Sequence, residues 1–157
     1  MAKQSVHEQD IRVPLVMRYD PLGVQGVVSD ALVLNVDLAR TIADVAGVEA
    51  PGAQGASLVP LLEGEGMPWR SDFLVEHLDG GSDLSPPSYC AVRTNRHLYA
   101  LYETGEEELY DLQEDPFQLQ SLAGDPGAGA IRDQLRRRLE VLCDNPPPGF
   151  PQELLER

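Results

Sequence analysis

The stretch that decides how this chain is organised is Lys3-Gln-Ser-Val-His-Glu-Gln-Asp-Ile-Arg-Val-Pro-Leu-Val-Met17, near the start of a sequence of 157 residues. In its second half, every second residue is apolar, namely Ile11, Val13, Leu15 and Met17. A two-residue period is typical of a β-strand. Because Pro14 has no N–H to give to a neighbouring strand, we expect this strand at a sheet edge or beside a bulge.

The next segments predict a helix followed by a long surface loop. Residues 19–34 contain turn-forming Pro and Gly residues and are expected to be an irregular connection. Asp37 is a candidate helix cap, and Gly47 lies where a helix commonly ends. Between them, one helical face is apolar and consists of Leu38, Ile42, Val45 and Ala46. Residues 49–70 are rich in Gly and Pro and contain one short apolar turn, residues 58–62.

The C-terminal part predicts a small antiparallel sheet covered by a helix. A strand-like segment occupies residues 72–77, and three short strands are expected over residues 89–93, 98–102 and 108–112, separated by turns. Their candidate core residues are Tyr99, Leu101, Leu109 and Leu112. Residues 131–143 repeat apolar side chains at helical spacing, so we expect this helix to cover one face of the sheet. The prolines at 146–148 end it.

Four segments resemble motifs of the sulfatases, a family of alkaline-phosphatase-like hydrolases, in order and spacing. The first contains Lys3, His7, Glu8 and Arg12-Val-Pro14, similar to the family's Gly-Lys pair, aromatic residue, Glu and Arg-Val-Pro. The second, Asn35–Val48, resembles the family's "vDlaPTildlAG" helix, and the third is Gly55–Gly64. The fourth joins residues 91–99 to Glu108-Leu-Tyr-Asp-Leu-Gln-Glu-Asp-Pro116, similar to the family's closing "ELYDLxxDP".

The resemblance extends over residues 3–145 and implies an α/β chain with a partial alkaline-phosphatase-like (sulfatase) fold. This fold is expected to end in a small antiparallel sheet covered by a C-terminal helix. Residues 1–78 are assigned to the C-terminal part of the catalytic domain, and residues 79–145 to a sheet-plus-helix subdomain. The boundary is placed in the Gly-, Ser- and Pro-rich residues 79–87. Residues 146–157 are expected to form a loose tail.

The resemblance implies hydrolysis of sulfate esters, but the chemical groups of that reaction do not transfer. Sulfatases convert a Cys or Ser in a Cys-x-Pro-x-Arg context into formylglycine, and neither Cys90 nor Cys143 has that context. The family's calcium ligands are Asp-Asp and Asp-Asn or Asp-His pairs that precede the Lys3 motif. A hard cation needs several converging oxygen ligands. We therefore expect no metal ligand and no cofactor-binding residue in this chain, which should be inactive alone.

Lys3 is the one candidate catalytic residue that the resemblance carries over. In the family, the matching lysine contacts a sulfate oxygen, where a compact ammonium offsets charge that develops in the transition state. Lys3 is the only lysine among twelve basic residues. Two positions depart from the family, since Ala2 replaces Gly and His7 replaces Tyr. Without the resemblance, Lys3 would be a solvated residue near a chain terminus.

Composition restricts the partners and the location. The formal net charge is −14 and the pI is near 4.4, so we expect neither nucleic acid nor a membrane surface as a partner. The sequence has no apolar run of transmembrane length, and its first ten residues are polar, so we expect a cytoplasmic protein without signal peptide. The acidic residues within 103–115 are expected to form a solvated hairpin, with a cation site as the alternative.

The remaining candidate residues favour structural roles. Cys90 and Cys143 are expected to be small buried hydrophobic residues, and a disulfide between them stays open. The histidines, His7, His77 and His97, have spacings that specify neither zinc nor a triad. Trp69 is expected to pack as a lid residue, with ligand stacking as the alternative. The arginines of the last helix are expected to be solvated, with an anion clamp as the alternative.

Two alternatives to an incomplete sulfatase remain open. In the first, the chain is a non-catalytic acidic module whose exposed sheet edge docks a separate N-terminal sulfatase half. In the second, it is a truncated gene product without function. A Cys-x-Pro-x-Arg segment encoded directly upstream would favour truncation, and a co-expressed separate half would favour docking. A sulfate ester is the expected substrate only of a complete enzyme.

Overall fold

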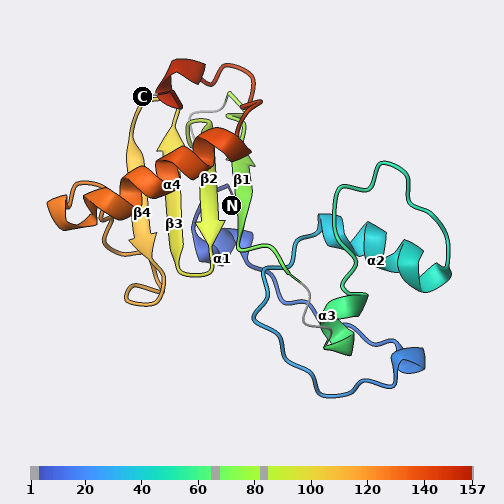
Figure 1. Cartoon of the computed structure of the whole chain (residues 1–157). Helices are drawn as coiled ribbons and strands as arrows, with labels where there is room; N and C mark the ends of the chain where they lie inside the picture. Colours follow the sequence, from blue (N-terminus) through green and yellow to red (C-terminus); the bar gives the residue numbers. More distant parts are fainter. Residues whose placement is uncertain (1–3, 65–67, 82–84, 157) are drawn as a thin grey trace. The chain divides into compact units, whose positions relative to one another are not determined.

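The computed structural model describes residues 4–64, 68–81 and 85–156, which fall into two compact units (Figure 1). The first consists of Met1–Pro14 together with Asp72–Arg157 and is called the sheet unit here. The second consists of Leu15–Ser71 and is called the helical unit. The chain therefore leaves the sheet unit after Pro14 and returns to it at Asp72.

The sheet unit contains a four-stranded antiparallel sheet with the strand order β1-β2-β3-β4. The strands are β1 (Asp72–His77), β2 (Tyr89–Thr94), β3 (His97–Tyr102) and β4 (Glu107–Asp111). The register places Leu74 opposite Val92 and Val92 opposite Tyr99. The three strands predicted after residue 88 are confirmed, and the strand-like segment at residues 72–77 pairs with the first of them.

One face of the sheet packs against helix α4 (Gly129–Leu142) (Figure 1). Strand side chains point alternately to the two faces, and those on this face are Cys90, Val92, Tyr99, Leu101 and Leu109. Leu135 and Leu139 meet them from the helix. The predicted helix and its position over the sheet are thus confirmed.

The tail after α4 also packs into this core, although it was expected to be loose. Phe150 and Leu155 are buried in the same cluster as Leu139, on either side of a short 3-10 helix, Gln152–Leu154. Burying two large apolar side chains stabilises the folded tail by the hydrophobic effect. The expectation failed because it considered the helix-ending prolines and not the two apolar residues beyond them.

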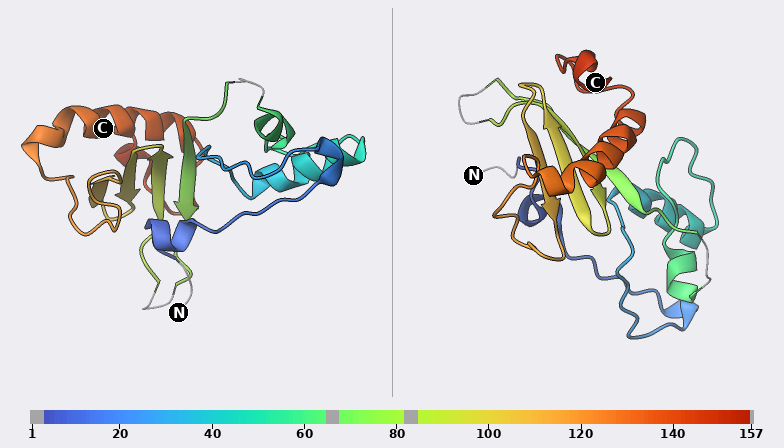
Figure 2. Two further views of the ribbon diagram at one scale, coloured as in Figure 1. Left: turned by 90° about the horizontal axis from the view of Figure 1, so that it is seen from below. Right: turned by 60° about the vertical axis from the view of Figure 1, so that its left-hand side comes forward.

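The other face of the sheet is covered by the N-terminal segment and helix α1 (Glu8–Ile11). Figure 2 shows the sheet between α4 on one side and α1 on the other. Val6 is fully buried here and Ile11 packs beside it, against side chains from Tyr89, Ala91, Leu98, Ala100, Tyr102 and Tyr110. The sheet is therefore the middle layer of three.

A disulfide joins Cys90 of β2 to Cys143 at the C-terminal end of α4, with Cα atoms 6.5 Å apart. Both residues are buried, as expected, but the description of each as a separate hydrophobic residue was wrong. The sulfur atoms meet because α4 packs directly on β2. A separation of 53 residues in sequence gives no sign of that contact.

The helical unit contains α2 (Val36–Ala46), α3 (Val59–Glu63) and a short 3-10 helix, Asp20–Leu22. The predicted helix is confirmed as α2, and Gly47 ends it with a left-handed φ of 67°. Asp37, however, is not its cap. It lies inside the first turn and is fully buried, while Asn35 occupies the N-cap position.

The strand predicted from the alternation of residues 11–17 is not formed. Ile11 ends α1, and residues 12–19 form neither helix nor strand. Val13, Leu15 and Val16 are exposed. A strand needs the hydrogen bonds of a neighbour, and the only sheet within the described ranges is the one made by β1 to β4. The alternation is therefore present in the sequence without a partner strand.

The expectation of a domain boundary stays a prediction. The boundary proposed at residues 79–87 falls between β1 and β2, which pair within one sheet of this chain. No helix in the described part of the chain has the length and apolar character to cross a membrane.

Candidate functional site

Lys3, the predicted catalytic residue, lies outside the described residues. The segment directly after it, residues 4–11, lies on the sheet face opposite α4 and is called the anchor segment here. Its contacts are the part of the site that the structure describes. They determine how firmly the chain next to Lys3 is held.

Two hydrogen bonds from distant parts of the sequence hold the backbone of the anchor segment. The hydroxyl of Tyr89 on β2 donates to the carbonyl of Gln4 at 3.2 Å. The backbone N–H of Glu8 donates to the side-chain carbonyl of Gln118, in the loop after β4, at 2.6 Å. The segment is therefore fixed at both Gln4 and Glu8 by groups on the sheet unit.

A local turn and an ion pair add to these bonds. The backbone N–H and the hydroxyl of Ser5 both donate to Asp10 Oδ2, at 3.0 and 2.5 Å. Arg93 on β2 donates through Nε and Nη2 to the two carboxylate oxygens of Glu8, at 2.7 and 3.0 Å. Bidentate hydrogen bonds between arginine and a carboxylate are among the stronger side-chain interactions. Both side chains are largely buried, which reduces screening by water.

His7, which stands where the family has Tyr, contacts an aromatic and acidic cluster. Its Nε2 lies 3.9 Å from Glu108 Oε2, and its ring centroid lies 5.7 Å from that of Tyr110. The hydroxyls of Tyr102 and Tyr110 each donate to Glu108 at 3.1 Å. Glu108 is therefore a shared acceptor beneath the anchor segment.

The phenols of this cluster are hydrogen-bond donors and not acids at neutral pH. Burial, and then the charges of Asp10 and Glu108, raise the pKa of Tyr89 to about 12. Burial, and then Glu108, raise the pKa of Tyr110 to about 12 and that of Tyr102 well above its ordinary value. Tyr89 thus keeps the proton that it donates to Gln4.

The other two histidines have neighbours of their own. His77 Nε2 lies 3.3 Å from the hydroxyl of Ser85, and its ring stacks on Tyr89 with centroids 5.4 Å apart. His97 lies 3.8 Å from Asp111. Burial lowers the pKa of His97, and the charge of Asp111 opposes that shift. These contacts agree with the structural roles expected for both residues.

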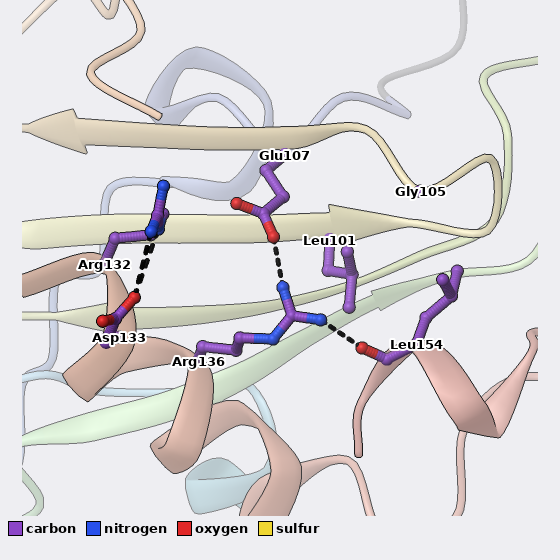
Figure 3. A pocket seen from close by; sticks show the side chains of 7 residues that line it. All are labelled: Leu101, Gly105, Glu107, Arg132, Asp133, Arg136 and Leu154. Atoms are coloured by element: carbon purple, nitrogen blue, oxygen red, sulfur yellow. Dashed lines mark hydrogen bonds and ion pairs between the residues drawn. The ribbon is translucent and has the colours of Figure 1, made fainter. Parts of the chain in front are cut away.

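Arg136 and Arg138 of α4 are paired with carboxylates on the sheet, so the expectation of a solvated helix face was wrong for these two. Arg138 donates to both oxygens of Asp72 on β1, at 2.7 and 2.8 Å. Arg136 donates to Glu107 at the start of β4 and to the carbonyl of Leu154 (Figure 3). These bonds join the helix to both edge strands and to the tail.

Arg136 lines a pocket of about 400 Å³ between α4, the hairpin formed by β3 and β4, and the tail (Figure 3). Its other lining residues are Leu101, Gly105, Glu107, Arg132, Asp133 and Leu154. The positive charge of Arg136 is matched by Glu107, and that of Arg132 by Asp133 at 3.2 Å. An anion would have to compete with these carboxylates, so the pocket is a poor anion clamp.

The acidic run is also less solvated than expected. Glu103 accepts a hydrogen bond from the backbone N–H of Ser88 at 3.0 Å, and Asp111 accepts from Arg96 at 2.6 Å. Among the described residues, the only group spaced for a metal ion is Glu76 with Cys90 and Cys143. Since the two cysteines are joined in the disulfide, they offer no thiolate to a metal. The described residues therefore do not fit the oxygen-rich set that calcium requires.

In the helical unit, the side chains of Trp69 and Arg70 are used for internal contacts. Trp69 Nε1 donates to the carbonyl of Leu32 at 2.8 Å, and the guanidinium of Arg70 lies 4.9 Å from the centre of the Trp69 ring. Arg70 also donates to both carboxylate oxygens of Asp37. Burial alone would raise the pKa of Asp37, but hydrogen bonds from Arg70 and two backbone N–H groups hold that pKa below its ordinary value. Since its N–H bonds to Leu32 and its ring contacts Arg70, Trp69 has a packing role within the helical unit.

Comparison with known proteins assigns the chain to a family. The sequence profile of the C-terminal part of N-sulphoglucosamine sulphohydrolase matches residues 1–145. The chain belongs to this sulfatase family. It is 32% identical over 144 residues to an N-acetylglucosamine-6-O-sulfatase of Bacteroides thetaiotaomicron, covering 88% of this chain and 26% of that protein. It is also 32% identical over 154 residues to human N-acetylglucosamine-6-sulfatase, covering 77% of this chain and 28% of that protein.

A solved structure supports the same assignment and the fold. The structure of a protein in complex with its substrate, D-glucosamine-2-N,6-O-disulfate, matches with a TM-score of 0.65 and 32% identity, covering 72% of this chain and 25% of that one. The predicted partial sulfatase fold, ending in a small antiparallel sheet under a helix, is confirmed. The sulfatase chain described here spans about a quarter of the length of these relatives.

Sequence reasoning found the residues that the sulfatase motifs contain but not those that hold them. Glu8 belongs to the Lys3 motif, whereas its partners Arg93 and Gln118 are far away in sequence. Arg93 lies in residues 91–99, one of the segments that resemble sulfatase motifs, so the sequence pointed to this position but not to its bond with Glu8. For Gln118, we find no local pattern that predicts its contact.

Proposed function

We propose that this chain is the C-terminal portion of a sulfuric ester hydrolase and that it does not cleave a sulfate ester by itself. The observation that carries the proposal is the family match over residues 1–145 in a sequence without a Cys-x-Pro-x-Arg segment. Covalent catalysis requires a nucleophile that attacks the substrate. In sulfatases, a formylglycine supplies this nucleophile and a calcium ion supplies charge stabilisation, and we assign both to the remaining part of the enzyme.

In this proposal, the chain contributes Lys3 and the support for it. The Lys3 ammonium would donate to a sulfate oxygen, which offsets negative charge as the ester bond breaks. The anchor segment keeps the neighbouring backbone in place through Tyr89, Gln118 and Arg93. The rest of the enzyme is provided either within one longer polypeptide or by a separate chain.

The substrate class that we propose is a sulfate ester of glucosamine. Two relatives are named as N-acetylglucosamine 6-sulfatases, and the matched solved structure contains a disulfated glucosamine. Such a substrate is anionic, and the chain has a formal net charge of −14. Long-range repulsion must therefore be overcome locally, by Lys3 and by the cation of the complete enzyme.

The second candidate, a module that docks a separate sulfatase half, is favoured by exposed apolar side chains. Val13, Leu15 and Val16 are exposed in the segment whose alternation predicts a strand, and Ile42 is exposed on α2. Exposed apolar residues that lie close together in the chain, as Val13, Leu15 and Val16 do, mark interaction sites. The partner of such a module would be a polypeptide that carries the formylglycine and the calcium ligands.

The test measures hydrolysis of p-nitrophenyl sulfate and of N-acetylglucosamine-6-sulfate with added calcium. We expect no turnover by this chain alone. We expect turnover when it is combined with the remaining sulfatase part of a close relative, produced as one fusion or as two chains. Lys3→Ala in the active combination should lower kcat strongly, whereas Arg12→Lys should leave it nearly unchanged. Hydrolysis by the chain alone that Lys3→Ala abolishes would overturn the proposal.

A further inference from the structure

We propose that Gln118 is a positioning residue, which sets the place of the anchor segment, the stretch that follows Lys3 in the sequence, by accepting a hydrogen bond from the Glu8 backbone. The contact itself is a property of this chain. Its importance for catalysis rests on the proposed function, in which Lys3 meets the sulfate ester.

The backbone at Gln118 is unusual. Its φ is 55°, and it is the only residue other than glycine with a positive φ in the part of the chain that the structure describes. The left-handed conformation is unfavourable for residues with a β-carbon, and it persists where surrounding contacts stabilise it. Residues with such a backbone cluster at functional sites.

The pattern of exposure around Gln118 is the reverse of the usual one. Gln118 is only 6% exposed, while its apolar neighbours Phe117 and Leu119 are 72% and 79% exposed. Apolar side chains are normally inside and glutamine is normally outside. The loop thus buries a polar side chain and leaves the two apolar side chains beside it exposed to solvent.

The loop is held on both sides of Gln118. The Gln118 N–H donates to the carbonyl of Asp115 at 3.1 Å, and the Gln120 N–H donates to the Asp115 carboxylate at 2.9 Å. Further along, the Leu122 N–H donates to the carbonyl of Leu109 on β4 at 2.7 Å. The backbone that carries Gln118 is therefore tied to an edge strand of the sheet.

Gln118 contacts the backbone N–H of Glu8, which has no acceptor within its own helix or from the N-cap side chain. Glu8 is the first residue of α1, where backbone N–H groups lack a partner within the helix. The N-cap residue His7 makes no side-chain capping bond. Gln118 therefore caps α1 from a position 110 residues away in sequence. Because an N–H must meet an acceptor, the bond also fixes which side-chain atom of Gln118 is the oxygen.

This capping bond determines the backbone position of the residues next to Lys3. Glu8 is held by Gln118 and Arg93, and Gln4 is held by Tyr89. Lys3 directly precedes Gln4. Small displacements of a catalytic group are costly in rate. A loss of the Gln118 acceptor should therefore affect the reaction more than the binding of substrate.

The experiment compares Gln118→Met, which keeps the length of the side chain without the acceptor, with Gln118→Glu, which keeps an acceptor. Phe117→Ser is the matched control, since it changes an exposed neighbour. In the chain alone, we expect Gln118→Met to speed hydrogen exchange at the Glu8 amide about tenfold or more, with β2 and β3 amides unchanged. Gln118→Glu should restore part of the protection. An unchanged Glu8 amide, or equal loss over the whole sheet, would overturn the proposal.

The second measurement uses the active combination with the remaining sulfatase part. We expect Gln118→Met to lower kcat about tenfold or more with little change in KM, and to add little to the effect of Lys3→Ala. An active enzyme whose kcat ignores Gln118→Met would refute the catalytic half of this inference. If no combination is active but the Glu8 amide responds as expected, the proposed function fails while the positioning of the anchor segment stands.

Discussion

The two units of the chain differ in what holds them together. In the sheet unit, apolar clusters are buried on both faces of one sheet, and Tyr99 and Leu139 are fully buried. In the helical unit, the most buried side chain is the charged Asp37, whereas the apolar Val16 is 92% exposed. One unit therefore has a hydrophobic core of its own, and the other is organised around a polar centre.

The polar centre of the helical unit collects several backbone groups. The Asp37 carboxylate accepts from the N–H groups of Leu34 and Ala56 and from Arg70. Gly55 is needed beside it, because a β-carbon there would lie 2.2 Å from the carbonyl oxygen of Val36. A polar centre specifies geometry but contributes less net stability than apolar burial. Under the proposed function, the exposed apolar side chains of this unit are the surface that the rest of a sulfatase would cover.

The largest effect is expected for Asp37→Ala, which leaves Arg70 and two backbone N–H groups without their acceptor. Breaking a buried ion pair in this way costs about 3–5 kcal/mol. We expect α2 to lose its protection in hydrogen exchange while β2 and β3 keep theirs. Asp30→Ala, at an exposed position, is the control. Loss of protection in both units would show that they do not differ as described.

Leu139→Ala tests the core of the sheet unit. Removing this fully buried side chain should lower the free energy of unfolding by about 2–5 kcal/mol, measured by urea denaturation followed by circular dichroism. Val141→Ala, on the exposed side of the same helix, should change it by about 0.5 kcal/mol or less. Similar effects from both substitutions would contradict the assignment of the core.

Replacing both Cys90 and Cys143 by Ala should destabilise the sheet unit by about 2–4 kcal/mol, because the cross-link restricts the unfolded chain. The same urea titration measures it. In the presence of a strong reductant, the native chain and the variant should become similar. A difference that persists under reducing conditions would be due to packing and not to the covalent bond.

The smallest effect is expected from acid titration of the pair Asp111 and Arg96. Hydrogen bonds from Arg96, partly opposed by burial, lower the pKa of Asp111 from 3.8 to about 2. The pair therefore stabilises the fold fully at pH values above 3.8, the ordinary pKa of an aspartate. This contribution is lost as the pH falls through about 2, the pKa in the folded state. Stability measured against pH should fall less steeply below pH 3.8 for Asp111→Asn. An identical acid limb in both proteins would refute the assignment.

The sequence predicted best those elements whose pattern is local. The strands β2 to β4 and helix α4 follow from alternation and helical spacing, because each element buries one face against the next. The same reasoning failed at residues 11–17, where the alternation is present but no partner strand exists in the described residues. A strand is a property of a pair, so its sequence alone is an incomplete prediction.

The candidate site shows a similar division. The sulfatase motifs identified Lys3 and Glu8, and the contacts of Glu8 depend on the distant residues Arg93 and Gln118. The role of Asp37 was mistaken for a cap because its partner, Arg70, lies outside the helix. The contact of Gln118 with Glu8 bridges 110 residues and depends on a left-handed backbone that no residue preference of glutamine indicates. Such contacts require the tertiary structure.

The bond between Cys90 and Cys143 closes a covalent ring that contains β3, β4 and α4. The loop with the exposed Phe117 and Leu119 lies within this ring. A protease that cuts the loop once would leave its two products linked, so they would migrate as one band in electrophoresis. They would separate only after a reducing agent opens the ring.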